Sequence, residues 1–159
     1  MKKITTILLL FVVILASCDE ESQNQIANLK TVSNRIQDLG KSKEDIKAME
    51  DPAALMQEDD YYLEYEYPIR ENESYVTTYR FMDDQCFEIK LDTYLDKENY
   101  AKKVQQEVMT DMANNKNFGK TSFKEDVFLW TSTDSKTLIQ LKTQNIERGT
   151  VNLVISLNK

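Results

Sequence analysis

The amino-acid sequence predicts an α+β domain, an antiparallel sheet of about six strands with helices packed on one face. Two observations support this fold class. Segments 22–39 and 97–115 repeat apolar residues at three- and four-residue spacing, as amphipathic helices do. Downstream of each segment the apolar period falls to two, the spacing of strands that bury one face. The predicted order is therefore helix or helices, three strands, helix, three strands. The two halves share this arrangement, but no residue-level repeat relates them.

The first predicted helix covers residues 22–39. One apolar stripe runs along it, formed by Ile26, Leu29, Val32, Ile36 and Leu39. Gly40 is a natural residue to end it. The stripe has two interpretations, a coiled-coil or partner-binding stalk, or a helix that packs on its own domain. Its repeat is shorter than the three or four heptads that a coiled coil needs, which favours packing on the domain.

A second, short helix is expected after Gly40. The sequence Ser42-Lys43-Glu44-Asp45 resembles a helix-capping signal. It predicts a helix that carries Ile46 and Met49, and Pro52 closes or redirects it.

The first strand is predicted from the alternation that begins at Asp60. Its apolar and aromatic face is formed by Tyr61, Leu63, Tyr65, Tyr67 and Ile69. Pro68 indicates a sheet edge or a strand end, because proline cannot donate a hydrogen bond to a neighbouring strand. Residues 70–74 are expected to form the following turn.

The next two strands form a hairpin whose register the sequence predicts. A three-residue loop, 83–85, places Arg80 opposite Glu88 and Tyr79 opposite Ile89, so that the core side chains share one face. A two-residue loop would set Arg80 against Phe87 and mix the faces, and a slip by one residue moves every side chain to the wrong side. We therefore expect the three-residue loop.

The second half repeats the pattern. Asp96 is expected to cap the helix over 97–115, in which Tyr100, Val104, Val108 and Met112 recur every four residues. Strands are predicted at 127–130, 138–141 and 151–157. Pairing Leu129 with Ile139 and Val127 with Leu141 would put Phe128, Trp130 and Leu138 together on the opposite face.

The N-terminal segment has the layout of a secretory signal. Met1-Lys2-Lys3 is a positive start, Ile4 to Leu15 is an apolar run, and Leu15-Ala16-Ser17-Cys18 follows. The run is shorter than the roughly 20 residues that a spanning helix needs. The four residues 15–18 resemble the lipobox of bacterial lipoproteins. The resemblance implies cleavage before Cys18 and acyl chains, such as palmitate, on the new N-terminal cysteine. The alternatives are an uncleaved anchor and a plain signal peptide.

This interpretation divides the chain into three parts. Residues 1–17 are a signal peptide that is removed, 18–25 a lipidated acidic tether, and 26–159 a single α+β domain. Asp19-Glu20-Glu21 resembles the export signal of some surface lipoproteins, although in other lineages Asp after the cysteine resembles an inner-membrane retention signal. The run also suits a helix start. The expected location is a lipid anchor in the cell envelope, with the outer membrane favoured and either its surface or its periplasmic face open.

Composition limits the functions to be considered. Removal of Lys2 and Lys3 with the signal peptide changes the net charge from −7 to −9, which repels the phosphates of nucleic acids. The chain has no histidine, so histidine-dependent catalysis and histidine-containing zinc sites are excluded. Cys86 is left without a disulfide partner, and we expect it to be buried. No cofactor and no metal are expected.

Candidate chemistry is sparse. Glu64 and Glu66 share one strand face, and paired carboxylates serve glycoside hydrolysis. Such pairs usually come from different strands across a cleft, and alternation in an exposed strand produces the same pattern. The clusters 58–60 and 83–84 lack the loop of an EF-hand. The sequence therefore favours a protein that is not an enzyme.

Aromatic residues are the better candidates for recognition. Tyrosines gather on two consecutive strands, and Phe128 and Trp130 form a second group. Aromatic side chains are enriched at binding surfaces, but they also fill sheet cores. The candidate binding residues are Phe128, Trp130, Leu138 and Tyr62.

Two functional hypotheses follow. The first is a non-enzymatic envelope lipoprotein that binds a protein or a glycan. The second is an inhibitor or immunity-type lipoprotein whose acidic surface binds a basic toxin or enzyme. The sequence leaves the partner and the oligomeric state open.

Overall fold

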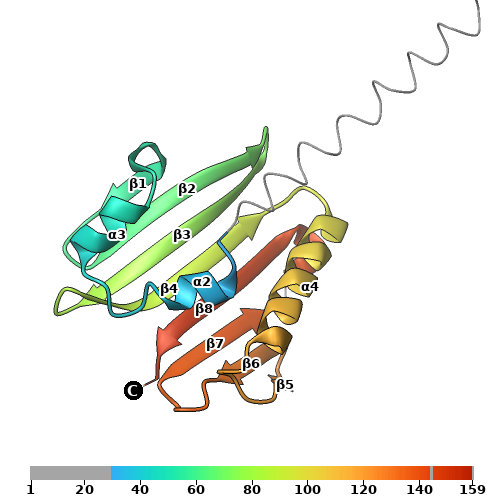
Figure 1. Cartoon of the computed structure of the whole chain (residues 1–159). Helices are drawn as coiled ribbons and strands as arrows, with labels where there is room; N and C mark the ends of the chain where they lie inside the picture. Colours follow the sequence, from blue (N-terminus) through green and yellow to red (C-terminus); the bar gives the residue numbers. More distant parts are fainter. Residues whose placement is uncertain (1–29, 144, 159) are drawn as a thin grey trace, which may run out of the picture.

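The computed structural model describes residues 30–143 and 145–158, which form one eight-stranded antiparallel sheet with helices against it (Figure 1). The α+β class is confirmed. The predicted strand number and element order are wrong in detail, because two short strands precede the predicted triplets, one in each half. Each is only three or four residues long and largely exposed, so neither shows an alternating pattern.

The elements, in chain order, are α2 (Val32–Ile36), α3 (Lys43–Met49), η1 (Pro52–Ala54), β1 (Leu55–Glu58), β2 (Tyr62–Arg70), β3 (Glu73–Met82), β4 (Gln85–Tyr94), α4 (Glu98–Asn114), β5 (Ser122–Lys124), β6 (Val127–Thr131), β7 (Thr137–Lys142), η2 (Ile146–Arg148) and β8 (Thr150–Leu157). Across the sheet the strand order is β1-β2-β3-β4-β8-β7-β6-β5. The chain thus makes one meander from β1 to β4, crosses to the far edge through α4, and returns to the centre through β5 to β8. The two centre strands, β4 and β8, are the last strands of the two meanders.

The first helix is much shorter than predicted. Within the described residues it begins at Val32, because the Thr31 side chain accepts a hydrogen bond from the Asn34 N–H and caps the helix there. The predicted part 22–29 and the tether 18–25 lie outside the described residues. After Ile36 the chain forms turns as far as Gly40, which has a φ of +81° and donates its N–H to the Cys86 carbonyl.

The second helix is confirmed. The Ser42 side chain accepts from the Asp45 N–H, and the Asp45 side chain accepts from the Ser42 N–H, which completes a capping box at the start of α3. Ile46 is fully buried, whereas Met49 is exposed. Pro52 opens the short helix η1.

Most of the predicted core face of β2 is confirmed, with Leu63, Tyr65 and Ile69 buried, but Tyr61 precedes the strand and is 72% exposed, so its assignment to this face is wrong. Strand β1 pairs with residues 63–65 of β2, so Pro68 lies beyond the part of β2 that this neighbour covers, and a bulge follows it. Proline is tolerated there because its missing N–H removes no bond to β1.

The hairpin between β3 and β4 corrects the predicted loop. Arg80 lies opposite Glu88 and Tyr79 opposite Ile89, as expected, but Phe81 pairs with Cys86 across a two-residue Asp83-Asp84 turn. Phe87 is the extra residue of a β-bulge, which accommodates the short turn without moving the core side chains to the wrong face. Both turn residues have positive φ, as a tight hairpin turn requires.

The second long helix, α4, is confirmed, but its predicted cap is wrong. Lys97 occupies the N-cap position and makes no capping bond with its side chain. The Asp96 N–H instead donates to the Glu73 carboxylate, which ties the helix entrance to β3. Val104 and Met112 are buried in the core, as the stripe predicted.

The register between β6 and β7 differs from the prediction by one residue. Trp130, not Leu129, pairs with Ile139, and Phe128 pairs with Leu141. Trp130 and Phe128 therefore share the face of Ile139, and Leu138 lies on the opposite one. The predicted grouping of Phe128, Trp130 and Leu138 is wrong because residues 127–130 are apolar on both faces, so they carry no alternation that fixes the register.

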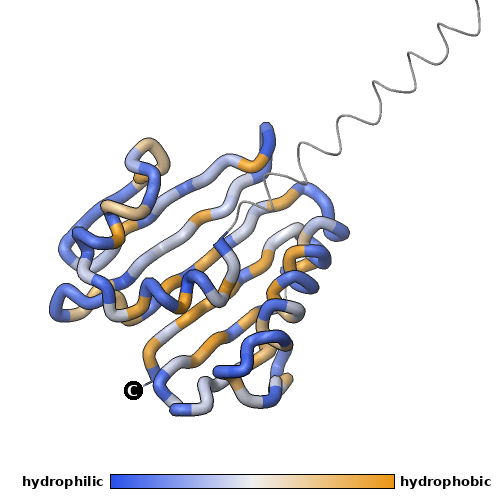
Figure 2. The backbone as a smooth tube through the Cα atoms, in the orientation of Figure 1, coloured by the Kyte–Doolittle hydropathy of each residue, from blue (hydrophilic) through white to orange (hydrophobic). Residues whose placement is uncertain are grey.

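The sheet has one covered and one open face. The helix-covered face carries the row Leu63, Tyr79, Ile89, Ile155, Ile139 and Trp130, all at most 1% exposed. Helices α2 and α4 lie side by side over this face (Figure 1). In Figure 2 the strands in the middle of the sheet carry apolar segments, and the connecting loops are mostly hydrophilic. The open face includes Tyr62, Glu64, Arg80, Glu88, Leu129 and Leu138.

No helix in the described part of the chain has the length and hydropathy needed to cross a membrane.

Candidate functional site

A pocket of about 360 Å³ lies between α2, α4 and the helix-covered face of the sheet. We call it the helix–sheet pocket. Its lining residues are Lys30, Thr31, Val32, Arg35, Tyr75, Leu91, Thr93, Val104, Glu107, Val108, Asp111, Val151 and Leu153. Ligand pockets are typically of about this size or larger and mostly apolar, with a few polar groups that orient the ligand. The helix–sheet pocket fits that description.

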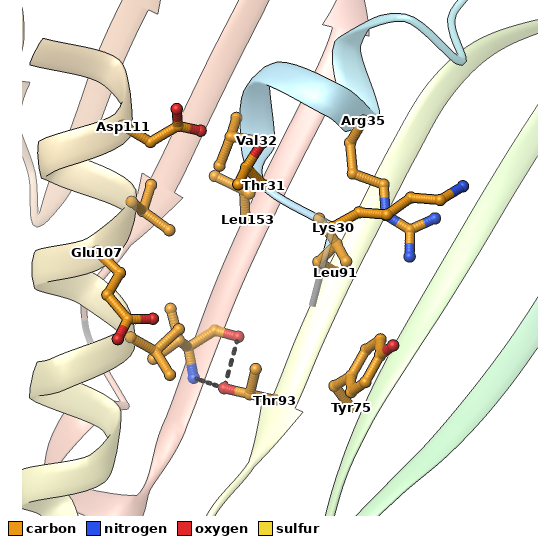
Figure 3. Close-up of a pocket in the computed structure, with 13 residues that line it drawn as sticks. Lys30, Thr31, Val32, Arg35, Tyr75, Leu91, Thr93, Glu107, Asp111 and Leu153 are labelled. Atoms are coloured by element: carbon orange, nitrogen blue, oxygen red, sulfur yellow. Dashed lines mark hydrogen bonds between the residues drawn. The ribbon is translucent and has the colours of Figure 1, made fainter. Parts of the chain in front are cut away.

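The polar residues of the pocket are divided between its two sides. Figure 3 shows Lys30, Arg35 and Tyr75 on one side and Glu107 and Asp111, both from α4, on the other. Between the two sides, aliphatic side chains from β4, β8 and α4 line the pocket. The pocket thus has a cationic side, an acidic side and an apolar floor.

The cationic side is the edge of a buried polar network centred on Glu50, the C-cap residue of α3. Glu50 Oε1 accepts hydrogen bonds from Arg35 Nη1 at 2.7 Å, Tyr79 Oη at 2.6 Å and Lys30 Nζ at 2.9 Å. Its second oxygen accepts from the Tyr67 hydroxyl. Arg35 and Glu50 are 2% and 8% exposed, so this ion pair lies inside the protein.

These contacts fix the charge of Glu50. Burial alone would raise its pKa, but the Arg35 charge and the hydrogen bonds from Tyr67, Tyr79 and Lys30 outweigh burial and lower the pKa to about 2. Burial and the neighbouring carboxylate raise the pKa of Tyr79 well above its usual value. Glu50 is therefore ionised and Tyr79 neutral at physiological pH.

Asp38 is a second buried carboxylate of this network. Asp38, which is 2% exposed, lies 2.8 Å from Lys41, 3.6 Å from Lys30 and 4.0 Å from Arg35. Lys30 and Arg35 line the pocket and are balanced by Asp38 and Glu50, whereas Lys41 lies outside the lining.

One polar atom of this side lacks a partner. The hydrogen bonds of Arg35 to the described residues use Nη1, and Arg35 Nε is buried without a hydrogen-bond partner among them. A buried donor left unpaired costs free energy, so such atoms usually bind a water or a ligand.

The acidic side is partly committed to structure. Asp111 accepts hydrogen bonds from the Ser33 N–H and hydroxyl, both at 2.9 Å, and so fastens the start of α2 to α4. Asn115 donates to the same hydroxyl at 3.0 Å. Glu107 is exposed at the rim.

The residues that the sequence singled out lie elsewhere. Phe128 and Trp130 are on the helix-covered face near the β5 edge, and Trp130 is 1% exposed. Tyr62 and Leu138 are on the open face, with β3, β4 and β8 between their strands. The structure does not bring the four residues together, and none of them lines the helix–sheet pocket.

An aromatic row leads from the β5 edge into the core. The Phe123 and Phe128 rings have centroids 4.5 Å apart, and those of Phe128 and Trp130 are 6.1 Å apart. Phe123 is 57% exposed. The row therefore offers one exposed ring, Phe123, supported by two residues that the sequence had suggested for binding.

Reactive groups are not gathered in the pocket. Cys86 is a free, fully buried thiol, as predicted, and burial raises its pKa to about 12. Glu64 and Glu66 lie on β2, on the open face, where Glu64 accepts a bond from Thr78. Among the described residues there is no group of three or more His, Cys, Asp or Glu side chains able to hold a metal.

Sequence reasoning missed the residues that shape the pocket, above all Arg35 and Glu50. Arg35 lies between the stripe residues Val32 and Ile36, and the helical pattern predicts a solvent-facing charge at this position. Its burial depends on Tyr79, which reaches it from another element. The sequence signal available was the hydroxyl of Tyr79 on a core-facing position, since a buried phenol needs a polar partner.

Comparison with protein families, with curated proteins and with solved structures found no match for this chain.

Proposed function

We propose that this chain is a lipid-anchored lipoprotein of the bacterial cell envelope whose domain is a non-enzymatic binding module. The lipobox-like residues Leu15-Ala16-Ser17-Cys18 carry the anchoring part. The observation that carries the binding part is the helix–sheet pocket, a mostly apolar space in which Asp111 is held by Ser33 and Arg35 by Glu50.

The states of the ionisable groups favour binding over catalysis. A general base works best with a pKa near the working pH, and the pKa of about 2 makes Glu50 a poor base. Asp111 is occupied by Ser33. A nucleophilic cysteine needs an exposed thiolate, whereas Cys86 is buried with a raised pKa.

The anchoring part is tested by metabolic labelling with an alkyne analogue of palmitate. The wild-type chain should incorporate the label and fractionate with membranes, and the Cys18→Ser variant should do neither. A Cys18→Ser chain that is processed and membrane-bound like the wild type would refute the lipid anchor. Protease treatment of intact cells, with a periplasmic protein as control, then distinguishes the cell surface from the periplasmic face.

A second candidate, a protein or glycan ligand at the β5 edge, is supported by the exposed ring of Phe123. Strand β5 also ends the sheet, so a partner strand could add there. Phe123→Ala should abolish capture of such a partner without loss of stability, since the ring is mostly exposed. Capture that is unchanged in Phe123→Ala would exclude this edge.

The inhibitor hypothesis gains less support. The open face mixes both signs of charge, with Arg80 3.0 Å from Glu88 and Lys90 2.6 Å from Asp92. An acidic surface complementary to a basic partner would be expected to concentrate carboxylates. Salt-sensitive capture of a cationic protein remains the measurement that would favour this alternative.

A further inference from the structure

We propose that the helix–sheet pocket binds a single-chain amphiphile with a carboxylate head, such as a medium-chain fatty acid, with the carboxylate at Lys30 and Arg35. This proposal rests on the proposed binding function and names its ligand class. It is carried by the volume and apolar lining of the pocket, the two cations at one side and the unpaired donor there.

The apolar part of the pocket suits one hydrocarbon chain. Its floor is built from aliphatic side chains, including Leu91, Val108 and Leu153. At roughly 30 Å³ per non-hydrogen atom, the share of a water molecule in the liquid, about 360 Å³ holds about a dozen atoms. That is the size of a medium-chain fatty acid, and too small for a lipid with two long chains.

The cationic side suits one carboxylate. Lys30 and Arg35 both line the pocket, and Asp38 and Glu50 balance their charge from outside the lining. Arg35 Nε is buried and unpaired within the described residues, and a guanidinium binds carboxylates through its fixed fork of donors. Lys30, whose side chain is 34% exposed, is able to turn toward a head group at the rim.

The position of the pocket along the chain supports a ligand that comes from a membrane. Lys30, Thr31 and Val32 all line the pocket. Lys30 lies twelve positions after Cys18, and a chain of that length spans at most about 40 Å. A lipid on Cys18 would therefore keep this end of the domain close to the bilayer, where free amphiphiles concentrate.

The experiment uses membranes that contain the full chain and a photoreactive, diazirine-bearing decanoic acid. Mass spectrometry then locates the label. We expect it on peptides that contain the pocket lining, from α2 and α4, and we expect decanoic acid to compete about tenfold better than decanol, because hydrogen bonds to charged groups are stronger than neutral ones. Equal competition by decanol, or better competition by decylamine, would overturn the assignment of the head group.

Variants locate the site. Val108→Trp fills the pocket and should lower labelling by about tenfold or more. The matched control is Gln106→Trp, an exposed position on the same helix outside the pocket lining, which should label like the wild type. Should Val108→Trp fail to fold, Lys30→Gln tests the same proposal, because it should weaken decanoate and leave decanol unchanged. Unchanged decanoate labelling in both variants would overturn the proposal.

Two further results separate the possible failures. A wild-type chain without label on the pocket lining refutes the proposal, and if an Ile26→Ser, Leu29→Ser variant is then labelled, the chain's own N-terminal segment is the occupant. Labelling of the pocket lining in a Cys18→Ser chain that stays in the membrane fraction like the wild type would keep the pocket assignment and refute the lipid anchor instead.

Discussion

Replacing Glu50 with glutamine removes the negative charge at the centre of the buried network and keeps the shape of the side chain. The structure indicates how much free energy of unfolding this substitution removes. The pKa of Glu50 falls from 4.5 to about 2, and at 1.36 kcal/mol per unit this corresponds to about 3 kcal/mol of stability at neutral pH. Loss of one partner of a buried ion pair costs a similar amount, because it leaves Arg35 charged and poorly compensated.

The direction of the pKa shift of Glu50 determines how the stability difference between wild type and variant changes with pH. Because the pKa of Glu50 is lower in the folded state, its contribution is fully present above the unfolded pKa of 4.5 and is lost as the pH falls toward 2. Glu50→Gln lacks this contribution at every pH. The difference in unfolding free energy between wild type and variant should therefore be about 3 kcal/mol at pH 7 and shrink below pH 4.5.

Urea unfolding followed by tryptophan fluorescence measures this difference, since Trp130 is buried in the core. With an m-value of about 2 kcal/mol/M, the midpoint should fall by about 1.5 M at pH 7. The matched control is Glu66→Gln, on the open face of β2, which should change stability by less than about 0.5 kcal/mol. A Glu50→Gln difference below about 1 kcal/mol, or one that is constant from pH 7 to pH 2, would refute the reasoning.

Three other predictions follow from local geometry. Gly149→Ala should destabilise the protein by about 2 kcal/mol or more in urea unfolding, because Gly149 has a φ of +77° and an added Cβ would lie 1.7 Å from the Leu95 carbonyl oxygen. Gly40→Ala is its control, with a similar φ and open space around the Cβ, and equal losses in the two variants would show that the clash is relieved. Ser42→Ala should cost about 1 kcal/mol through loss of the capping box, and an unchanged midpoint would contradict the cap. Cys86 should react with a maleimide only after unfolding, because the thiol is fully buried and its pKa is raised to about 12, so rapid labelling of the native protein at pH 7 would contradict its burial.

The sequence predicted best where one residue pattern determined one structure. The Ser42 to Asp45 capping box, the alternating core face of β2 and the stripe of α4 are local signals, and each is present. The hairpin was half predicted. Its core register was right because Tyr79 and Ile89 must share a face, but the two-residue turn was missed, since a β-bulge at Phe87 reconciles the turn with that register.

The pocket could not be predicted, because it depends on contacts between distant parts of the chain. Arg35 is paired with Glu50 and Tyr79, which are 15 and 44 residues away along the chain. A helical pattern shows which residues are apolar, not which charges become buried by a partner. The register of β6 was predicted wrongly for a related reason. Which face of the sheet is covered at Phe128 and Trp130 depends on β8 and α4, and the local sequence of β6 does not show it.

The place of β8 at the centre of the sheet has a consequence for how the chain is made. During synthesis β8 emerges after the seven other strands, yet it is the strand that joins the two meanders. Until it pairs with β4, the first meander keeps the long edge of β4 open, and the second keeps that of β7. Contacts between β4 and β8 link residues about 60 positions apart, which slows folding. A chain truncated before Thr150 should therefore yield two half-sheets prone to aggregation through those edges.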